Sequence, residues 1–260
     1  ILYSQRIKKA LDPNNILTPG KGPGGNIVAE GLSHFSAALL VEQLRGPLRS
    51  MEFRKRIEAS YANTRRADAE RPMVKVDGSK EGDRTVTYDK GGWVFWMLTD
   101  LMGRERALAG LQEFVTTFKD GPDFPVLQDL IAVMRRHAAD PDAFDAFVDQ
   151  WFYQVAVPEF RFTEVEKVDL GDGDAWEIRA TIRNDGTGTV PLEVAAARGD
   201  RMNKDGTENP DYRDARTSLT IGPGQEIPVT IRCDFEPDRV LPDPDARVLQ
   251  LERARALRRM

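Results

Sequence analysis

The sequence predicts an α+β protein of more than one domain, in which a helical region is followed by an antiparallel β region. Up to about residue 156, apolar residues recur at the spacing of amphipathic helices. After Pro158, apolar and polar residues alternate in short runs, which is typical of half-buried strands. With 260 residues, the chain is long enough for two domains with separate cores.

The beginning of the chain is rich in turn-forming residues. A short helix leads into DPNNILTPGKGPGGN, a Pro/Gly-rich connector, so we treat residues 1–25 as a separate segment. Helical spacing then begins at Ile27 and continues to about Leu44. A charged helix over residues 51–64 and a short extended stretch, ERPMVKV at 70–76, are expected next.

Four further helices complete a helical subdomain, which we place at residues 26–156. One begins near Tyr88 and runs through GGWVFWMLTDLM. Because this helix is apolar on nearly every side, we expect it to be buried. The other three are expected at residues 104–118, 124–138 and 142–155.

Five alternating segments predict the strands of the β region: FRFTEVEKVDL, AWEIRATIRN, TVPLEVAAAR, RTSLTIG and EIPVTIRCDF. Turn-forming stretches such as GDGD and NDGTG separate them. This succession predicts an antiparallel β-sandwich of the immunoglobulin type at residues 157–240. The basic residues at 241–260 are interpreted as a solvated C-terminal tail.

Composition narrows the classes of function. The net charge of −5 argues against a general affinity for nucleic acid or anionic membranes, which requires a concentrated positive surface. The single cysteine, Cys233, excludes an internal disulfide, and we interpret it as a half-buried strand residue. No apolar run reaches the roughly 20 residues that span a bilayer, and no secretory signal is recognisable, so the location stays open.

Three polar residues stand out near the starts of two helices. Glu30 and His34 are four residues apart on one helix face, so both could bind the same metal ion. Taken alone, such a pair is far more often solvated at a helix surface. Tyr88 lies where a phenol could face a cleft, and the alternative is a packed tyrosine with its hydroxyl at the surface.

Several segments together resemble the gluzincin zinc aminopeptidases, the family of alanyl aminopeptidases and leukotriene hydrolases. AEGLSHFSA resembles the helix that carries the third zinc ligand, and TYDKGGWVFWMLTDLMG resembles the Tyr-x-Lys-Gly helix. AFVDQWFYQVAVPEF is similar to the passage from the helical domain into a β-sandwich. AERPMVKV and EPDRVLPDPDARVLQL are similar to a bacterial branch found with membrane transporter subunits, so a transporter is a candidate partner.

The resemblance implies a role for each matching position. Glu30 would be a zinc ligand. Tyr88 would donate a hydrogen bond to the oxyanion that forms when water attacks a peptide carbonyl, a contribution of about 3–4 kcal/mol to the barrier. Gly31, His34 and Lys90 would line the cleft, and no chemistry is assigned to Lys90. The implied substrate is a peptide.

The zinc-binding motif of that family is not found at the expected positions. A gluzincin needs two histidines from H-E-x-x-H, with the glutamate as general base. Counting back from the third ligand by the spacing of the family gives Ile7 and Leu11 at the histidine positions and Lys8 at the base. The two histidines of the chain, His34 and His137, are not placed to substitute. We therefore expect zinc in the complete parent enzyme, but neither bound zinc nor activity in this chain alone.

Residues 2–23 resemble a different family, the C-terminus of FAD-linked oxidases of the vanillyl-alcohol oxidase type. There, a helix also runs into a DPNxILxPGK turn. A fusion or misassembled reading frame near Gly22–Gly25 would explain this, and the alternative is an ordinary helix and Pro-Gly turn. The glycines of PGKGPGGN lack the strand and helix of a loop that binds FAD phosphates.

Three hypotheses of function follow. The first is a fragment of a zinc aminopeptidase that is active only with its other half. The second is a non-catalytic interaction module that retains the fold and exposes apolar surface where that half would dock. The third is a terminal piece of an FAD-linked oxidase, which leaves most of the chain unexplained.

Overall fold

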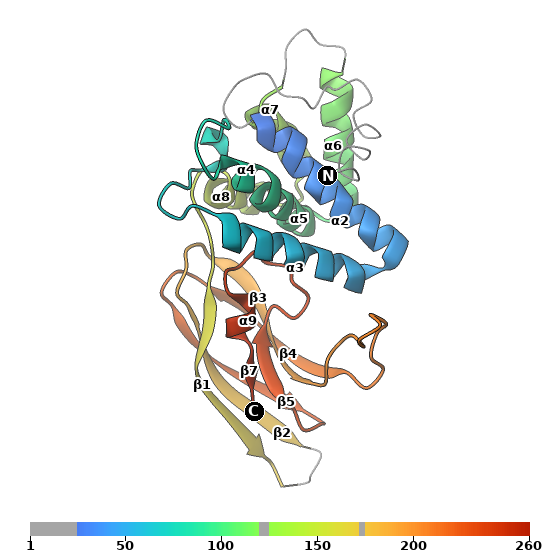
Figure 1. Cartoon of the computed structure of the whole chain (residues 1–260), viewed down its shortest axis with the longest axis vertical. Coiled ribbons are helices and arrows are strands. Elements are labelled where there is room, and N and C mark those ends of the chain that lie inside the picture. Colours follow the sequence, from blue (N-terminus) through green and yellow to red (C-terminus); the bar gives the residue numbers. More distant parts are fainter. Residues whose placement is uncertain (1–24, 120–124, 172–174) are drawn as a thin grey trace. The chain divides into compact units, whose positions relative to one another are not determined.

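The computed structural model describes residues 25–119, 125–171 and 175–260 (Figure 1). The chain divides into two compact units, with the boundary between Val155 and Ala156. The first unit is helical and the second contains antiparallel sheets, so the protein belongs to the α+β class, as predicted. The predicted oxidase-like segment, residues 2–23, lies outside the described residues.

The helical unit consists of consecutive helices with short connections. They are η1 (Ile27–Gly31), α2 (Leu32–Arg45), α3 (Pro47–Thr64), η2 (Met73–Lys75), α4 (Asp83–Thr85), η3 (Val86–Lys90), α5 (Gly91–Met102), α6 (Arg104–Phe118), α7 (Leu127–His137) and α8 (Pro141–Trp151). Two details differ from the prediction. Helix α3 begins before residue 51, because Gly46 turns the chain at φ +85° and Pro47 starts the next helix. The stretch at 70–76 contains the 3₁₀ turn η2 rather than a continuous strand.

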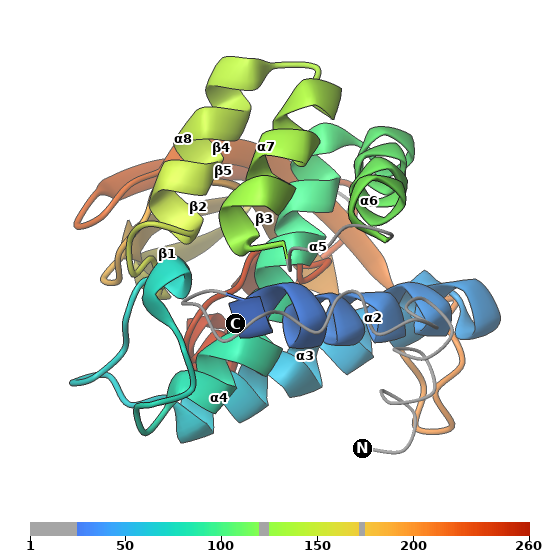
Figure 2. The ribbon, with the colours of Figure 1, turned by 90° about the horizontal axis from the view of Figure 1, so that it is seen from above.

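Helix α5 is the centre of this unit. It contacts α2, α3, α6 and α8, and Figure 2 shows it between these helices. All its side chains from Trp93 to Leu98 are buried, as the apolar pattern predicted. The Trp93 indole also donates a hydrogen bond to the Arg54 carbonyl at 3.0 Å. These contacts fix α5 relative to α3, so the turn that precedes α5 is held on a rigid support.

The second unit contains two antiparallel sheets. Their strands are β1 (Phe160–Asp169), β2 (Trp176–Asn184), β3 (Val190–Arg198), β4 (Arg213–Ile221), β5 (Glu226–Cys233), β6 (Arg239–Pro242) and β7 (Arg258–Arg259), with a short helix α9 (Arg253–Ala256) before β7. One sheet has the order β1-β2-β5 and the other β4-β3-β6-β7. All five predicted strands are present, and β6 and β7 are additional.

The end of the chain corrects one prediction. Residues 241–260 were interpreted as a solvated tail, yet Leu249 and Ala256 have no exposed surface. Strand β7 also pairs with β6, with Arg259 opposite Arg239. The apolar residues between the basic ones are buried in the unit, so this segment is part of the β fold. None of the helices within the described ranges combines the length and apolar character that a bilayer span requires.

Candidate functional site

Two π-helical turns carry the candidate residues. The turn η1 contains Glu30 and continues directly into α2. The turn η3 contains Tyr88, Asp89 and Lys90, and it lies between α4 and α5 in one continuous helical segment. A π-helical turn accommodates one residue more than an α-helical turn, and such turns are frequent at functional sites.

Glycines bring the two helical segments into close contact. A Cβ atom on Gly31 would lie 3.2 Å from the Cα atom of Gly91. On Gly92, a Cβ atom would lie only 2.6 Å from the Cβ atom of His34. Larger residues would therefore push the segments apart. Gly31, which the resemblance placed in the lining of a cleft, is instead buried in this contact.

Glu30 and Tyr88 meet across these turns. Both side chains are half-buried, and the Glu30 carboxylate lies close enough to the Tyr88 hydroxyl to influence its pKa. Burial raises the pKa of Tyr88, and the negative charge of Glu30 raises it further. Both effects favour the protonated phenol. The Arg84 guanidinium lies 5.6 Å from the centre of the Tyr88 ring and is a third neighbour.

His34 is the next residue of this cluster. Its ring lies edge-on to the Tyr88 ring, with 5.4 Å between the centroids. Its Nδ1 atom is 3.4 Å from Oδ1 of Asp89. Burial lowers the pKa of His34, and the charges of Asp89 and Glu30 act in the opposite direction. His34 thus contacts the Tyr88 ring on one side and lies beside Asp89, a residue that the sequence analysis did not single out.

Asp89 could have been found from its place in the TYDKG segment. It lies next to Tyr88 in the π turn, and its side chain is buried. Burial raises the pKa of Asp89, while a hydrogen bond from Ser60 and the charge of His34 lower it. A charged residue within a run of otherwise packed residues is a signal of a specific partner.

Lys90 lies in a second, buried cluster. Its Nζ atom is 2.6 Å from Oε1 of Glu70, and both side chains are only 1% exposed. The Tyr61 hydroxyl donates to the two carboxylate oxygens of Glu70 at 2.8 and 2.9 Å, and the Arg65 Nε atom donates at 3.0 Å. Lys90 was expected to line a cleft. The structure corrects this, because the ammonium group is enclosed by its ion pair.

The charges of this second cluster stabilise one another. Burial alone would raise the pKa of Glu70, but the charge and hydrogen bonds of Lys90, Tyr61 and Arg65 lower it overall. Burial also lowers the pKa of Lys90, which the charge of Glu70 opposes. The Glu70 carboxylate is therefore ionised and fully occupied by donors.

The described residues do not form a zinc site by themselves. Across residues 25–119, 125–171 and 175–260, no three His, Cys, Asp or Glu side chains are arranged to hold a metal ion. Zinc sites in proteins use three or four such ligands. The other histidine, His137, forms a hydrogen bond between its Nε2 atom and Oε2 of Glu113 at 2.6 Å, which joins α7 to α6. The site consists of the Glu30 carboxylate and the Tyr88 phenol, on two turns that contact each other.

Comparisons with known proteins identify a similar fold. No protein-family model matches the chain, and no curated protein matches it at a significant level. Among solved structures, the chain is similar to aminopeptidase A from Legionella pneumophila in complex with aspartic acid, with a TM-score of 0.50 and 18% identity. The match covers 87% of this chain and 24% of that chain, so the present chain spans about a quarter of that protein. The chain has an aminopeptidase-like fold.

Two β-glucosidases also match part of the chain. They are DesR from Streptomyces venezuelae in complex with D-glucose and β-glucosidase 3B from Thermotoga neapolitana in complex with glycerol. Each is 12% identical, and the matches cover 41% and 40% of this chain and 15% and 18% of those chains, respectively. Their TM-scores of 0.25 and 0.24 are too low to support a shared fold.

Proposed function

We propose that this chain is the helical and β portion of a zinc aminopeptidase of the gluzincin type. In this proposal, Glu30 is the one zinc ligand that the chain supplies, and the two imidazoles and the general base come from sequence outside it. The observation that carries the proposal is that Glu30 and Tyr88 lie on two π-helical turns that contact each other. The aminopeptidase-like fold supports it independently.

The part of Tyr88 in this chemistry follows from its protonation state. A tyrosine keeps its proton at neutral pH, and the raised pKa of Tyr88 acts in the same direction. A protonated phenol can donate a hydrogen bond to the negative charge that develops on a peptide carbonyl oxygen. A donor aimed at such a charge is worth about 3–4 kcal/mol of barrier. In the resting chain, the carboxylate of Glu30 is the negative charge beside the phenol.

The same proposal assigns the remaining parts of the chain. The second unit would be the immunoglobulin-type sandwich that follows the helical subdomain in this family. A peptide would be the substrate, and a membrane transporter subunit of the bacterial branch would be a partner of the parent protein.

Complementation tests this function. The purified chain alone should bind no stoichiometric zinc and hydrolyse no aminoacyl anilide. Joined to a gluzincin N-terminal half that contains H-E-x-x-H, it should become active. Glu30→Ala should then abolish hydrolysis, and Tyr88→Phe should lower kcat by about 10²–10³-fold.

Tyr153 provides the matched control for the phenol. Its side chain is 45% exposed after the end of α8, so Tyr153→Phe should leave kcat unchanged. Two results would contradict the proposal. One is saturable zinc binding by the chain alone, and the other is hydrolysis that survives Tyr88→Phe at the level of the control.

A further inference from the structure

A buried ion pair in the helical unit has no role in the chemistry proposed above. Lys90 and Glu70 are 2.6 Å apart, and each side chain is only 1% exposed. Removing two charges from water is costly, and apolar residues of similar size often give the same stability or more. In some proteins, buried polar pairs of this kind serve to select one register among several. Lys90 is placed to have that effect.

Lys90 closes the π-helical turn that contains Tyr88. The turn η3 holds one more residue than the α-helical turns on either side of it. The π turn could form one position earlier or later along the helix, and few backbone hydrogen bonds would be lost by such a shift. Successive residues of a helix point about 100° apart. A shift by one residue would therefore turn the Tyr88 hydroxyl away from Glu30.

Glu70 gives the Lys90 ammonium a single fixed partner. The carboxylate is held by Tyr61 and Arg65, which lie in α3 and at its C-terminal end. Tyr61 itself has no exposed surface. Lys90, the last residue of η3, is thus linked to α3. This contact is separate from the contact between η3 and η1. A shift of the π turn by one residue would turn the Lys90 side chain away from this carboxylate.

We propose that Lys90 and Glu70 are positioning residues that fix the register of the π-helical turn and thereby aim the Tyr88 hydroxyl at Glu30. The resemblance to zinc aminopeptidases assigns neither residue this role. The inference rests on the proposed function only in taking Tyr88 as the working group of the site.

Tyrosine NMR on the full chain tests this inference. The chain has five tyrosines, and labelling their ring Cζ atoms with ¹³C gives one signal for each phenol environment. The Tyr88 signal is identified by its loss in Tyr88→Phe. In the wild-type chain, we expect a single Tyr88 signal that differs from that of exposed Tyr153. The double variant Lys90→Met with Glu70→Gln removes both charges but keeps an acceptor for Tyr61 and Arg65.

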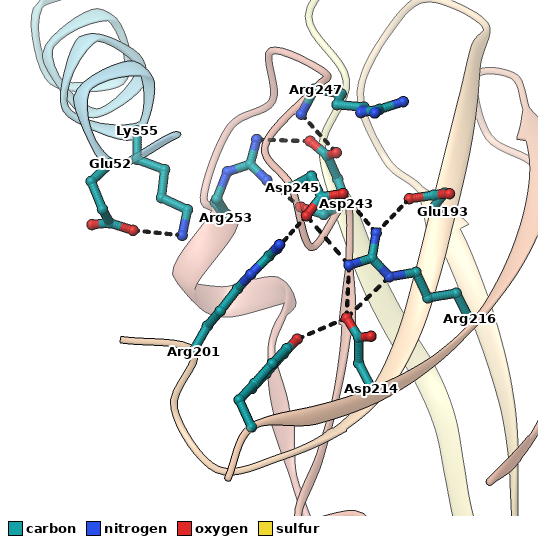
Figure 3. Close-up of polar contacts among 11 residues, drawn as sticks. Glu52, Lys55, Glu193, Arg201, Asp214, Arg216, Asp243, Asp245, Arg247 and Arg253 are labelled. Carbon is teal, nitrogen blue, oxygen red and sulfur yellow. Dashed lines mark hydrogen bonds and ion pairs between the residues drawn. The ribbon is translucent and has the colours of Figure 1, made fainter. Parts of the chain in front are cut away.

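In the double variant, the Tyr88 signal should move towards that of Tyr153 or split into two. The matched control is Lys55→Met, because Lys55 forms an ion pair with Glu52 at 3.0 Å on the partly exposed surface of α3 (Figure 3). That change should leave the Tyr88 signal in place. If the double variant is unfolded by circular dichroism, Lys90→Met alone decides, because the Glu70 carboxylate keeps Tyr61 and Arg65 as donors, and the same displacement is expected.

The outcomes separate the inference from the proposed function. A folded charge-free variant with an unchanged Tyr88 signal would overturn the positioning role, whatever the chain does with peptides. A wild-type Tyr88 signal identical to that of Tyr153 would instead show that Tyr88 is not held beside Glu30, as the proposed function requires. Hydrolysis is not needed for either result.

Discussion

At the scale of single residues, close contact between two helical segments makes the site. Tyr88 and Glu30 meet because the helices that carry them touch through glycines rather than through side chains. Gly92 has the closest contact, since a Cβ atom there would lie 2.6 Å from the Cβ atom of His34. The Cβ atom of His34 is attached directly to the backbone, so it cannot move aside unless the helix moves with it.

Gly92→Ala should therefore destabilise the helical unit. Overpacking of a closed contact costs about 1–3 kcal/mol, which outweighs the gain of about 1 kcal/mol in helix propensity. Urea unfolding followed by circular dichroism would measure the loss. Gly110→Ala is the matched control, because its Cβ atom would meet the flexible Met134 Sδ atom at 2.8 Å. Equal stability of the two variants would argue against a tight contact at Gly92.

The sequence singled out Glu30 and Tyr88 of the candidate site but not the residues around them. Glu30 and Tyr88 lie in motifs whose spacing resembles a known family. Glu70 has no such signal, because it precedes Lys90 by 20 residues and lies in a connection. The family resemblance placed Lys90 in the lining of a cleft, and charged residues are seldom fully buried. Pairing between distant charges is a property of the folded chain, and no local pattern of residues encodes it.

At the scale of elements, an ionic cluster joins two connections of the β unit to strand β4. The Arg216 guanidinium donates to Glu193 at 2.9 Å, to Asp214 at 2.8 Å and to Asp245 at 2.6 Å (Figure 3). Arg201, from the connection after β3, also pairs with Asp245. Asp245 lies in the connection after β6, so this carboxylate holds together segments far apart in the sequence.

Asp245 should make the stability of the β unit sensitive to acid. Burial alone would raise its pKa, but Arg216 and Arg201 lower it from 3.8 to about 2. A lowered pKa stabilises the fold above the ordinary value, and this stabilisation is lost as the pH falls towards 2. The shift corresponds to a free energy of unfolding on the order of 2 kcal/mol. Asp245→Asn should remove it at neutral pH.

Urea unfolding of the β unit, followed by circular dichroism near neutral pH and at about pH 2.5, would reveal this loss as a lower midpoint. The wild-type chain should lose stability on acidification, and Asp245→Asn should lose less. Asp234→Asn is the control, because Asp234 also pairs with an arginine, Arg213, but its side chain is 81% exposed. If both variants show the wild-type acid response, the cluster does not contribute to stability.

Elements with a long, regular pattern were predictable, and short ones were not. Helix α6 lies at the predicted residues, because its apolar positions repeat over several turns. Strand β6 has only four residues and ends at Pro242, so its sequence favoured a connection. The basic residues near the C-terminus concealed the apolar ones between them. In such segments, pairing with an existing strand decides the structure, rather than local preference.

At the scale of the whole molecule, the chain has two units and an aminopeptidase-like fold, but covers only 24% of the similar protein from Legionella pneumophila. Its described residues supply one carboxylate and one phenol of the proposed site, and no set of three metal ligands. The account therefore depends on Glu30 being a ligand in a larger assembly. Tyr88 would bind charge on the substrate, not the metal.

The zinc affinity of the reconstituted protein tests this central claim most directly. The chain would be joined to a gluzincin half that supplies both imidazoles, and zinc binding would be titrated for the wild type, Glu30→Gln and Tyr88→Phe. Because losing a residue that only orients a ligand already costs about 10–100-fold in affinity, Glu30→Gln should cost at least about 100-fold. Tyr88→Phe should bind zinc as the wild type does. Wild-type affinity in Glu30→Gln would contradict the account.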